Sequence, residues 1–172
     1  MIKHRLRRAE RRGAAVVEAA FIIPICLLFL LGIYEYGRFI MVRQLLDNAA
    51  REGARYAVVH TQTKTTADIQ NVVDQYLAGQ GVQLDAYDKT VNIQVFKADP
   101  VTGAPLDAYG NVVAWTAAPF NNAVFGQAIA VQITGTYRPV LPALVAYNRG
   151  QLTIMPSTVS VQSTCIMYSE TN

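Results

Sequence analysis

The chain has 172 residues, of which 16% are charged and 52% are hydrophobic. Charged residues are scarcer than the roughly 25% usual in soluble domains, which argues against a purely soluble protein. The formal net charge of +3 is concentrated at one end, because residues 1–13 contain six basic side chains and one glutamate. A short basic tail beside an apolar run favours a membrane topology signal over a nucleic-acid surface.

Residues 14–33 form an almost uninterrupted apolar run directly after this basic leader. As a helix, a run of 20 residues is about 30 Å long, which matches the hydrocarbon layer of a membrane. The run is longer than the core of a secretory signal peptide and lacks an A-x-A-like cleavage site. We therefore predict a transmembrane helix over residues 14–35, with a cytoplasmic N-terminus and an exported C-terminal part in the cytoplasmic membrane.

The helical pattern continues past the predicted membrane border. From residue 36 to residue 59 there is no proline, and apolar or small residues recur at steps of three and four, which marks one helical face. We predict a water-side extension of the same helix over residues 36–60, packed on another part of the protein. The face consists of Phe39, Val42, Leu46, Ala49, Gly53 and Ala57.

Residues 61–172 are predicted to form a small exported domain. A helix is expected over residues 66–78, with Thr65 or Thr66 as its cap. Its apolar stripe consists of Ile69, Val72, Val73, Tyr76 and Leu77. The pattern then changes to an alternation of apolar and polar residues, which is typical of half-buried strands. The expected strands are residues 91–95, 129–133 and 159–161, with shorter candidates at 112–115 and 152–154. The predicted fold class is α+β, with an antiparallel sheet covering the water-side half of the long helix.

The sequence contains no pattern that indicates catalysis. Neither His4 nor His60 has a partner at metal-ligand spacing, and the chain has no Gly-rich phosphate loop, nucleophile elbow or zinc signature. Acidic residues at positions 85, 88, 99 and 107 are expected to form turns, although pairs of them could hold a cation. We therefore expect no enzyme activity, no cofactor, no metal, no nucleic-acid partner and no small-molecule substrate.

Glu18 is the one charged residue inside the apolar run. A carboxylate at the centre of a membrane costs about 2.5–3.5 kcal/mol on insertion scales, and a position nearer the interface costs less. One interpretation is a protonated or water-exposed carboxyl without a role. The other is that Glu18 pairs with a cation from a neighbouring subunit. Cleavage after Gly13 would create such a cation, the free α-amine of Ala14, four residues before Glu18.

Three segments of the N-terminal third resemble a known family. Residues 12–24 read RGAAVVEAAFIIP, residues 32–38 read GIYEYGR, and residues 48–57 read NAAREGARYA. A glycine followed five places later by glutamate, as in Gly13 and Glu18, is similar to the cleavage site of type IV prepilins and pseudopilins. The longer pattern resembles the TadE-like domain of tight-adherence (Tad/Flp) pilus systems.

The resemblance implies a minor pilin or pseudopilin that helps to assemble a thin adhesive pilus. Its implied partners are a prepilin peptidase, other pilin or pseudopilin subunits, the pilus assembly machinery and membrane lipid. Gly13 and Ala14 would be the cleavage pair, and Glu18 the acidic residue for processing and assembly. Major Flp pilins are very short and carry tyrosine after this glutamate, whereas this chain has Ala19 and a long exported domain. The resemblance therefore argues against the main filament subunit.

Two other functions remain open from the sequence. The first is an uncleaved single-pass membrane protein that presents a small extracytoplasmic binding domain. The second is a membrane-anchored enzyme, for which the sequence offers no site. The pilin and the uncleaved anchor differ in the mature N-terminus, which begins at Ala14 only if the leader is removed.

Overall fold

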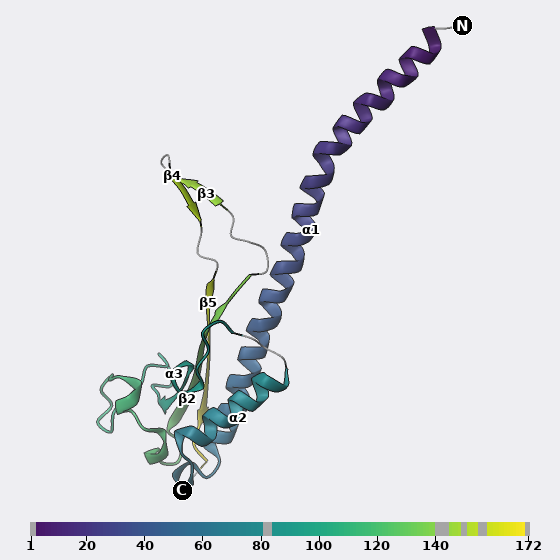
Figure 1. Cartoon of the computed structure of the whole chain (residues 1–172). Helices are drawn as coiled ribbons and strands as arrows, with labels where there is room; N and C mark the ends of the chain where they lie inside the picture. Colours follow the sequence, from purple (N-terminus) through teal and green to yellow (C-terminus); the bar gives the residue numbers. More distant parts are fainter. Residues whose placement is uncertain (1–2, 81–83, 140–144, 149–150, 155–157, 171–172) are drawn as a thin grey trace. The chain divides into compact units, whose positions relative to one another are not determined.

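The computed structural model describes residues 3–80, 84–139, 145–148, 151–154 and 158–170. It contains a long N-terminal helix, further helices and a three-stranded antiparallel sheet, so the predicted α+β fold class is confirmed (Figure 1). The chain divides into two compact units, Met1–Arg38 and Phe39–Asn172. The first unit contains only the early part of helix α1, and the second contains the whole sheet.

Helix α1 (Lys3–Val58) begins eleven residues before the predicted start at residue 14. The residues of the leader explain the difference, because Arg, Ala, Leu and Glu are strong helix formers and no proline interrupts them. The domain boundaries that we predicted at residues 13 and 35 both lie inside this helix, so secondary structure does not mark them. These boundaries stay predictions.

The C-terminal end of α1 is closed by His60 and Thr61. His60 adopts the left-handed conformation with φ of 52°, which stops the helix. The Thr61 hydroxyl donates to the carbonyl oxygens of Ala57 at 3.1 Å and Val58 at 3.2 Å. Two of the carbonyl groups that every helix end leaves without an intrahelical partner are thereby satisfied.

The predicted apolar face of α1 is buried in the second unit. Leu46, Ala49 and Ala57 have no exposed surface, and Val42 is 7% exposed. Gly53 lies closest to its neighbours, because a Cβ atom at this position would lie 2.5 Å from Cγ2 of Val73. Only glycine permits this approach between α1 and the elements that cover it.

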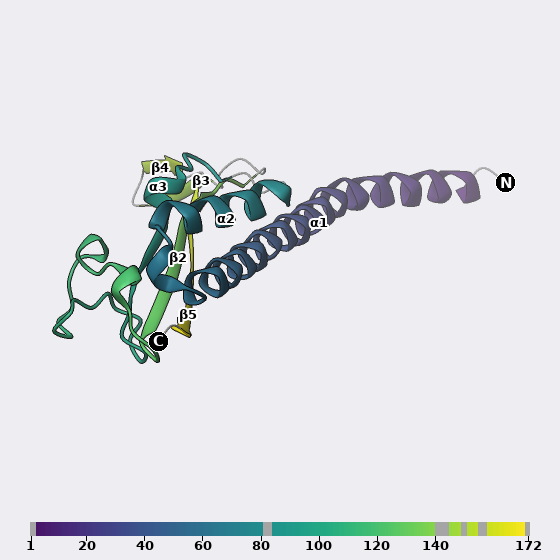
Figure 2. The ribbon, with the colours of Figure 1, turned by 90° about the horizontal axis from the view of Figure 1, so that it is seen from below.

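Helix α2 (Thr66–Gly79) covers part of this face, as the two views in Figures 1 and 2 show. It begins with a capping box, in which Thr65 Oγ1 accepts the Asp68 N–H and the Asp68 carboxylate accepts the Thr65 N–H. Of the predicted stripe, Ile69, Val73 and Leu77 are buried. The predicted helix over residues 66–78 is therefore confirmed with one additional residue.

The main sheet has the strand order β1-β2-β5, with every pair antiparallel. Its strands are β1 (Ile93–Lys97), β2 (Ala128–Tyr137) and β5 (Val159–Tyr168). Alternate side chains face opposite sides of the sheet. One side packs with α1 and α2 through Ile93, Val95, Ile129, Val131 and Ile133. The other side packs Phe96, Ala98 and Ala130 against Ala118, Val113 and Trp115.

Two strand predictions need correction, and a third is confirmed with one additional residue. Strand β1 begins two residues later than predicted, because Asp88 caps a short helix, α3 (Lys89–Asn92), that contains Val91. The region 112–115 is not a strand: Val112 forms only an isolated bridge with Leu106, and a 3-10 helix, η2, spans Trp115–Ala117. The short strand at 152–154 is present as β4 (Gln151–Ile154), paired with the unpredicted strand β3 (Val145–Asn148).

Candidate functional site

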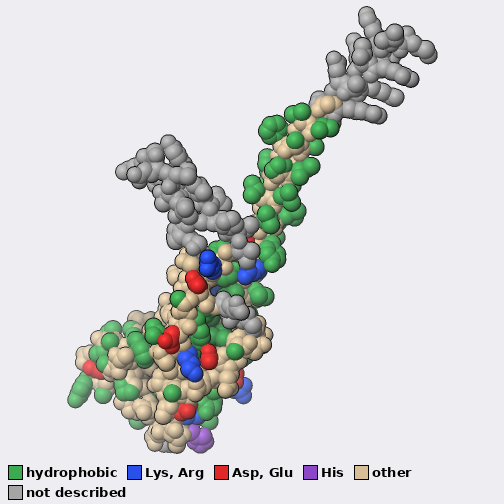
Figure 3. Space-filling view, viewed as in Figure 1, with side chains coloured by type: hydrophobic (Ala, Val, Ile, Leu, Met, Phe, Trp, Pro, Cys, Tyr) green, Lys and Arg blue, Asp and Glu red, His purple; other side chains and the backbone are tan. Residues whose placement is uncertain are grey.

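The candidate site is the N-terminal half of α1, whose apolar side chains are exposed. Among the described residues, the segment Ala15–Val58 is the one helix long and apolar enough to cross a membrane. Phe21 is 72% exposed and Leu30 is 63% exposed. Figure 3 shows hydrophobic side chains along the visible face of this part of the helix. A surface of this kind is unstable in water and stable in lipid or against other apolar helices.

Gly13, Ala14 and Glu18 all lie on this part of α1. Glu18 follows Ala14 by four residues, so the two positions share one helix face and are separated by about 6 Å along the axis. A Cβ atom added at Gly13 would meet no described atom within 4 Å beyond the neighbouring backbone of its own helix. The helix therefore brings the three predicted residues together within little more than one turn.

The Glu18 carboxylate is exposed and forms no hydrogen bond or ion pair with any residue whose side chain the structure describes. Its neighbours from residue 15 to residue 23 are exposed and apolar or small. In lipid, a carboxylate in these surroundings is costly until a proton, water or a cation compensates it.

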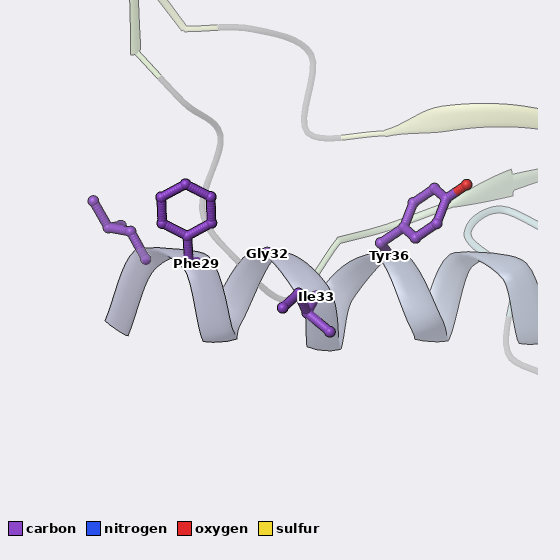
Figure 4. Close-up of a pocket in the computed structure, with 5 residues that line it drawn as sticks. Phe29, Gly32, Ile33 and Tyr36 are labelled. Carbon is purple, nitrogen blue, oxygen red and sulfur yellow. The ribbon is translucent and has the colours of Figure 1, made fainter. Parts of the chain in front are cut away.

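A notch that the sequence analysis did not identify lies further along the same helix. Gly32 is flanked on one side of α1 by Phe29 and Tyr36, whose rings stand on either side of the glycine in Figure 4. Ile33 and Leu28 complete the lining. In the sequence, Gly32 follows Phe29 by three positions and precedes Tyr36 by four, and this spacing could have indicated the notch. Small residues in membrane helices allow a neighbouring side chain or helix to approach closely.

The water-side border of the predicted span carries the one ion pair of the described residues. Arg38 Nη1 lies 3.8 Å from Glu35 Oε1, at a spacing of three residues. The pair is partly buried, with the Arg38 side chain 32% exposed and the Glu35 side chain 15% exposed. At the border of the predicted span, charged side chains remain in the headgroup region and limit how far the apolar segment moves into the membrane.

The remaining polar residues have structural roles. Asp88, Asp99 and Asp107 accept backbone N–H groups of their own turns, and these hydrogen bonds hold the pKa of each carboxyl below its ordinary value. For Asp88, the hydroxyl of Thr90 contributes most. Within the described residues, no group of three or more metal-ligating side chains lies together. Cys26 and Cys165 are both free thiols.

Comparison with known proteins gives one match. The family model described as TadE-like protein matches residues 13–55, which includes Gly13, Ala14 and Glu18 as well as the start of the buried helical face. No curated protein and no solved structure matches the chain. A TadE-like match suggests a pilin-like protein associated with a Tad pilus. Residues 13–55 of this chain are a TadE-like segment, in agreement with the resemblance found in the sequence.

Proposed function

We propose that this chain is a minor pilin or pseudopilin that takes part in assembling a Tad/Flp-type adhesive pilus, and that it is not an enzyme. In this proposal, α1 crosses the cytoplasmic membrane with its basic N-terminus in the cytoplasm, and the domain is exported. A prepilin peptidase cuts between Gly13 and Ala14. The mature protein then joins other pilin or pseudopilin subunits through its apolar helix.

The orientation is supported by charge. Six basic residues precede Gly13, and only one acidic residue lies among them. Such an excess is held on the cytoplasmic side during insertion. On the other side of the span, the charges of Glu35 and Arg38 cancel. The charge at that border therefore does not favour the opposite orientation in the membrane.

The observation that carries the assembly role is the exposed Glu18 carboxylate in an apolar stretch, with no partner among the side chains that the structure describes. Cleavage after Gly13 leaves a cationic amine on Ala14. A neighbouring subunit displaced by about 6 Å along the helix axis would bring this amine level with Glu18. An amine–carboxylate pair inside a helical bundle fixes the register of the two helices that it joins, because breaking it leaves two uncompensated charges in an apolar environment.

The cleavage step is tested by N-terminal sequencing of the protein purified from its native host. The expected mature N-terminus is Ala14. A protein that retains Met1 in cells with an active prepilin peptidase would show that processing does not occur. In that case the chain is a single-pass anchor for an exported binding domain.

The assembly step is tested with Glu18→Gln in the same host. The substitution keeps the size of the side chain and removes its charge, so membrane insertion should persist while the amount of sheared surface pili falls at least about tenfold, as for loss of a buried ion pair. Glu52→Gln is the matched control, since it neutralises an exposed glutamate on the same helix outside the predicted span and should leave the pilus yield unchanged. Equal pilus yield from the Glu18→Gln variant and the wild type would contradict the assembly role.

A further inference from the structure

Strand β5 forms one edge of the main sheet, since β2 is its neighbour on one side only. The strand has ten residues, Val159–Tyr168, and none of them is charged or a proline. Sheet edges in native proteins are usually short, charged, interrupted by proline or covered by another segment, because an open edge accepts a further strand. The length and composition of β5 therefore suit an edge that pairs with another strand.

The pairing of the sheet determines which backbone groups of β5 point outward. In an antiparallel sheet, successive residues direct their N–H and C=O groups to opposite neighbours. The Ala128 carbonyl accepts the Ala98 N–H at 2.9 Å, so the even-numbered residues of β2 face β1. Even-numbered residues of β2 pair with even-numbered residues of β5. The outward backbone groups of β5 consequently belong to Ser160, Gln162, Thr164, Ile166 and Tyr168.

The opposite edge of the sheet is covered, whereas this one is open. At β1, the Lys97 N–H donates to the Ala118 carbonyl at 3.0 Å, and the Lys97 carbonyl accepts the Leu106 N–H at 2.9 Å. The connection between β1 and β2 thus occupies the outer side of β1. Within the described residues, no segment forms hydrogen bonds of this kind with the outward groups of β5.

The water-side part of α1 runs alongside β5 in the same direction. Near the start of β5, Arg43 of α1 and Gln162 line one small hollow. Beyond the end of β5, the Glu170 N–H donates to the Val58 carbonyl at 3.2 Å. A strand added to the open edge would therefore have α1 beside one of its faces.

Arginines lie on α1 along this line. Arg43, Arg51 and Arg55 are exposed and belong to one row of the helix, in which residues recur every four positions. Burial raises the pKa of the Cys165 thiol on β5, and the nearby Arg51 guanidinium acts in the opposite direction. None of the three arginines forms an ion pair with a side chain that the structure describes. Asp47 is the one acidic residue of the row, so the row has an excess of positive charge.

The spacing of this row matches the spacing of a strand. Four residues of a helix advance about 6 Å, and two residues of an antiparallel strand advance about 6.8 Å. Alternate side chains of an added strand point toward the same face, and they would stay level with successive positions of the row. Carboxylates at those places would form charge-assisted hydrogen bonds with the guanidinium groups.

We propose that the open edge of β5 takes up an extended acidic segment of a partner protein as an additional antiparallel strand, with carboxylates on alternate residues at Arg43, Arg51 and Arg55. Strand addition of this kind draws its affinity from backbone hydrogen bonds and its specificity from alternate side chains. A second copy of β5 is a poorer occupant, because it has no acidic side chain. The inference concerns the exported domain alone and does not depend on the proposed pilin function.

The probe is a fluorescein-labelled peptide of the length of β5 in which valine and glutamate alternate. The matched peptide has lysine in place of glutamate. Fluorescence anisotropy measures the binding of each to the full-length protein in a non-ionic detergent at neutral pH. We expect the glutamate peptide to bind and the lysine peptide to bind at least about tenfold more weakly, since it loses hydrogen bonds between charged groups. Absence of binding by the glutamate peptide would overturn the proposal.

Two variants separate the charge from the backbone. Arg51→Gln should weaken binding of the glutamate peptide about tenfold, whereas Lys89→Gln, which removes a positive charge beside β1, should leave it unchanged. Thr164→Pro removes an N–H group that points away from β2, so the sheet can persist while strand addition is blocked. It should weaken binding at least about tenfold, and Thr164→Val, which keeps the N–H group, should not. Wild-type affinity in either Arg51→Gln or Thr164→Pro would overturn the proposal.

If Thr164→Pro fails to fold, the peptide backbone provides the same test. In an antiparallel strand whose glutamates face α1, the valine N–H groups face β5. N-methylation of the valine amides should therefore weaken binding more than N-methylation of the glutamate amides, and any other order would overturn the proposal. Sedimentation of the protein without peptide tests the other occupant. Self-association that Thr164→Pro abolishes would assign the edge to a second copy and would also overturn the proposal.

Discussion

The part of α1 before Arg38 exposes its large apolar side chains, whereas the part from Phe39 onward buries those of one face and leaves others, such as Met41, exposed. Leu30 is 63% exposed and Leu46 is not exposed at all, although both occupy the same helix. The difference lies in the residues that surround each leucine on the helix surface. The first part is apolar on every face, which suits lipid, and the second is apolar on one face, which suits a protein core. One helix therefore has a segment suited to lipid and a segment suited to a protein core. The composition of its faces shows where each segment begins.

The largest expected effect comes from truncating a leucine in each part. Leu46→Ala should lower the free energy of unfolding of the domain by about 2–5 kcal/mol, because it removes buried methyl groups and leaves a cavity. Leu30→Ala, its matched control, should leave this free energy unchanged. Chemical denaturation of the full-length protein in detergent, followed by the fluorescence of Trp115, measures both. Equal losses for the two variants would mean that the comparison between the two parts is wrong.

A smaller effect is expected from adding a methyl group at two glycines of α1. Gly53→Ala should lower the free energy of unfolding by about 1–3 kcal/mol, because the stiff side chain of Val73 lies where the new Cβ must go. Gly37→Ala has open space and should change stability by no more than about 1 kcal/mol, in the stabilising direction.

The contact between Gly53 and Val73 can be isolated with a double variant. Val73→Ala alone creates a cavity and is destabilising. In combination with Gly53→Ala, the two changes should compensate each other, so that the double variant is more stable than the sum of the single effects. Strict additivity in the same denaturation assay would argue that the two residues do not pack together.

The smallest effect concerns charged groups. The pKa of Asp68 is lowered from its ordinary value of 3.8, chiefly by the backbone N–H of Thr65. A lowered pKa in the folded state stabilises the fold above the unfolded value, and this stability is lost as the pH falls through the folded value. The domain should therefore lose stability progressively below about pH 4.

Asp68→Asn tests this origin of the acid sensitivity. The variant should be less stable than the wild type at pH 7, and the difference between them should shrink at pH 3. Glu18→Gln is the comparison from the other part of the chain and should leave domain unfolding unchanged at both pH values, since Glu18 has no partner in the described chain. A difference that grows toward pH 3 would contradict the sign of the pKa shift.

Periodicity was sufficient to predict the water-side part of α1, helix α2 and the main strands, but not α3. Leu46 and Ala49 indicated the buried face of α1, and Ile69 and Val73 indicated that of α2, because each set recurs at the helical spacing. The start of β1 was misplaced because the Asp88 cap, a local hydrogen-bonding choice, overrides the alternation that includes Val91. The hairpin of β3 and β4 lacked a recognisable turn signal in the sequence.

The candidate site and a cleft in the exported domain differ in how much the sequence could reveal. Gly13, Ala14 and Glu18 are close in sequence, so a local pattern of charge and apolarity was enough to select them. The cleft at one end of the main sheet is lined by residues from Lys97 to Tyr168, and their proximity depends on the pairing of β2 with β5. Lys97 itself follows an apolar strand and reads as an ordinary polar end residue. Only the fold shows that it is buried.

The closure of α1 has a consequence for the order of folding. The Val58 carbonyl accepts the N–H of Glu170, and the Thr61 hydroxyl contacts that of Ser169 at 3.2 Å across a sequence separation of 108 residues. Contacts of such long range form only after a large chain loop has closed, and they slow the approach to the native state. During synthesis, the C-terminal end of α1 consequently stays frayed until β5 has been made and has paired. The domain becomes a single cooperative folding unit only near the end of its synthesis.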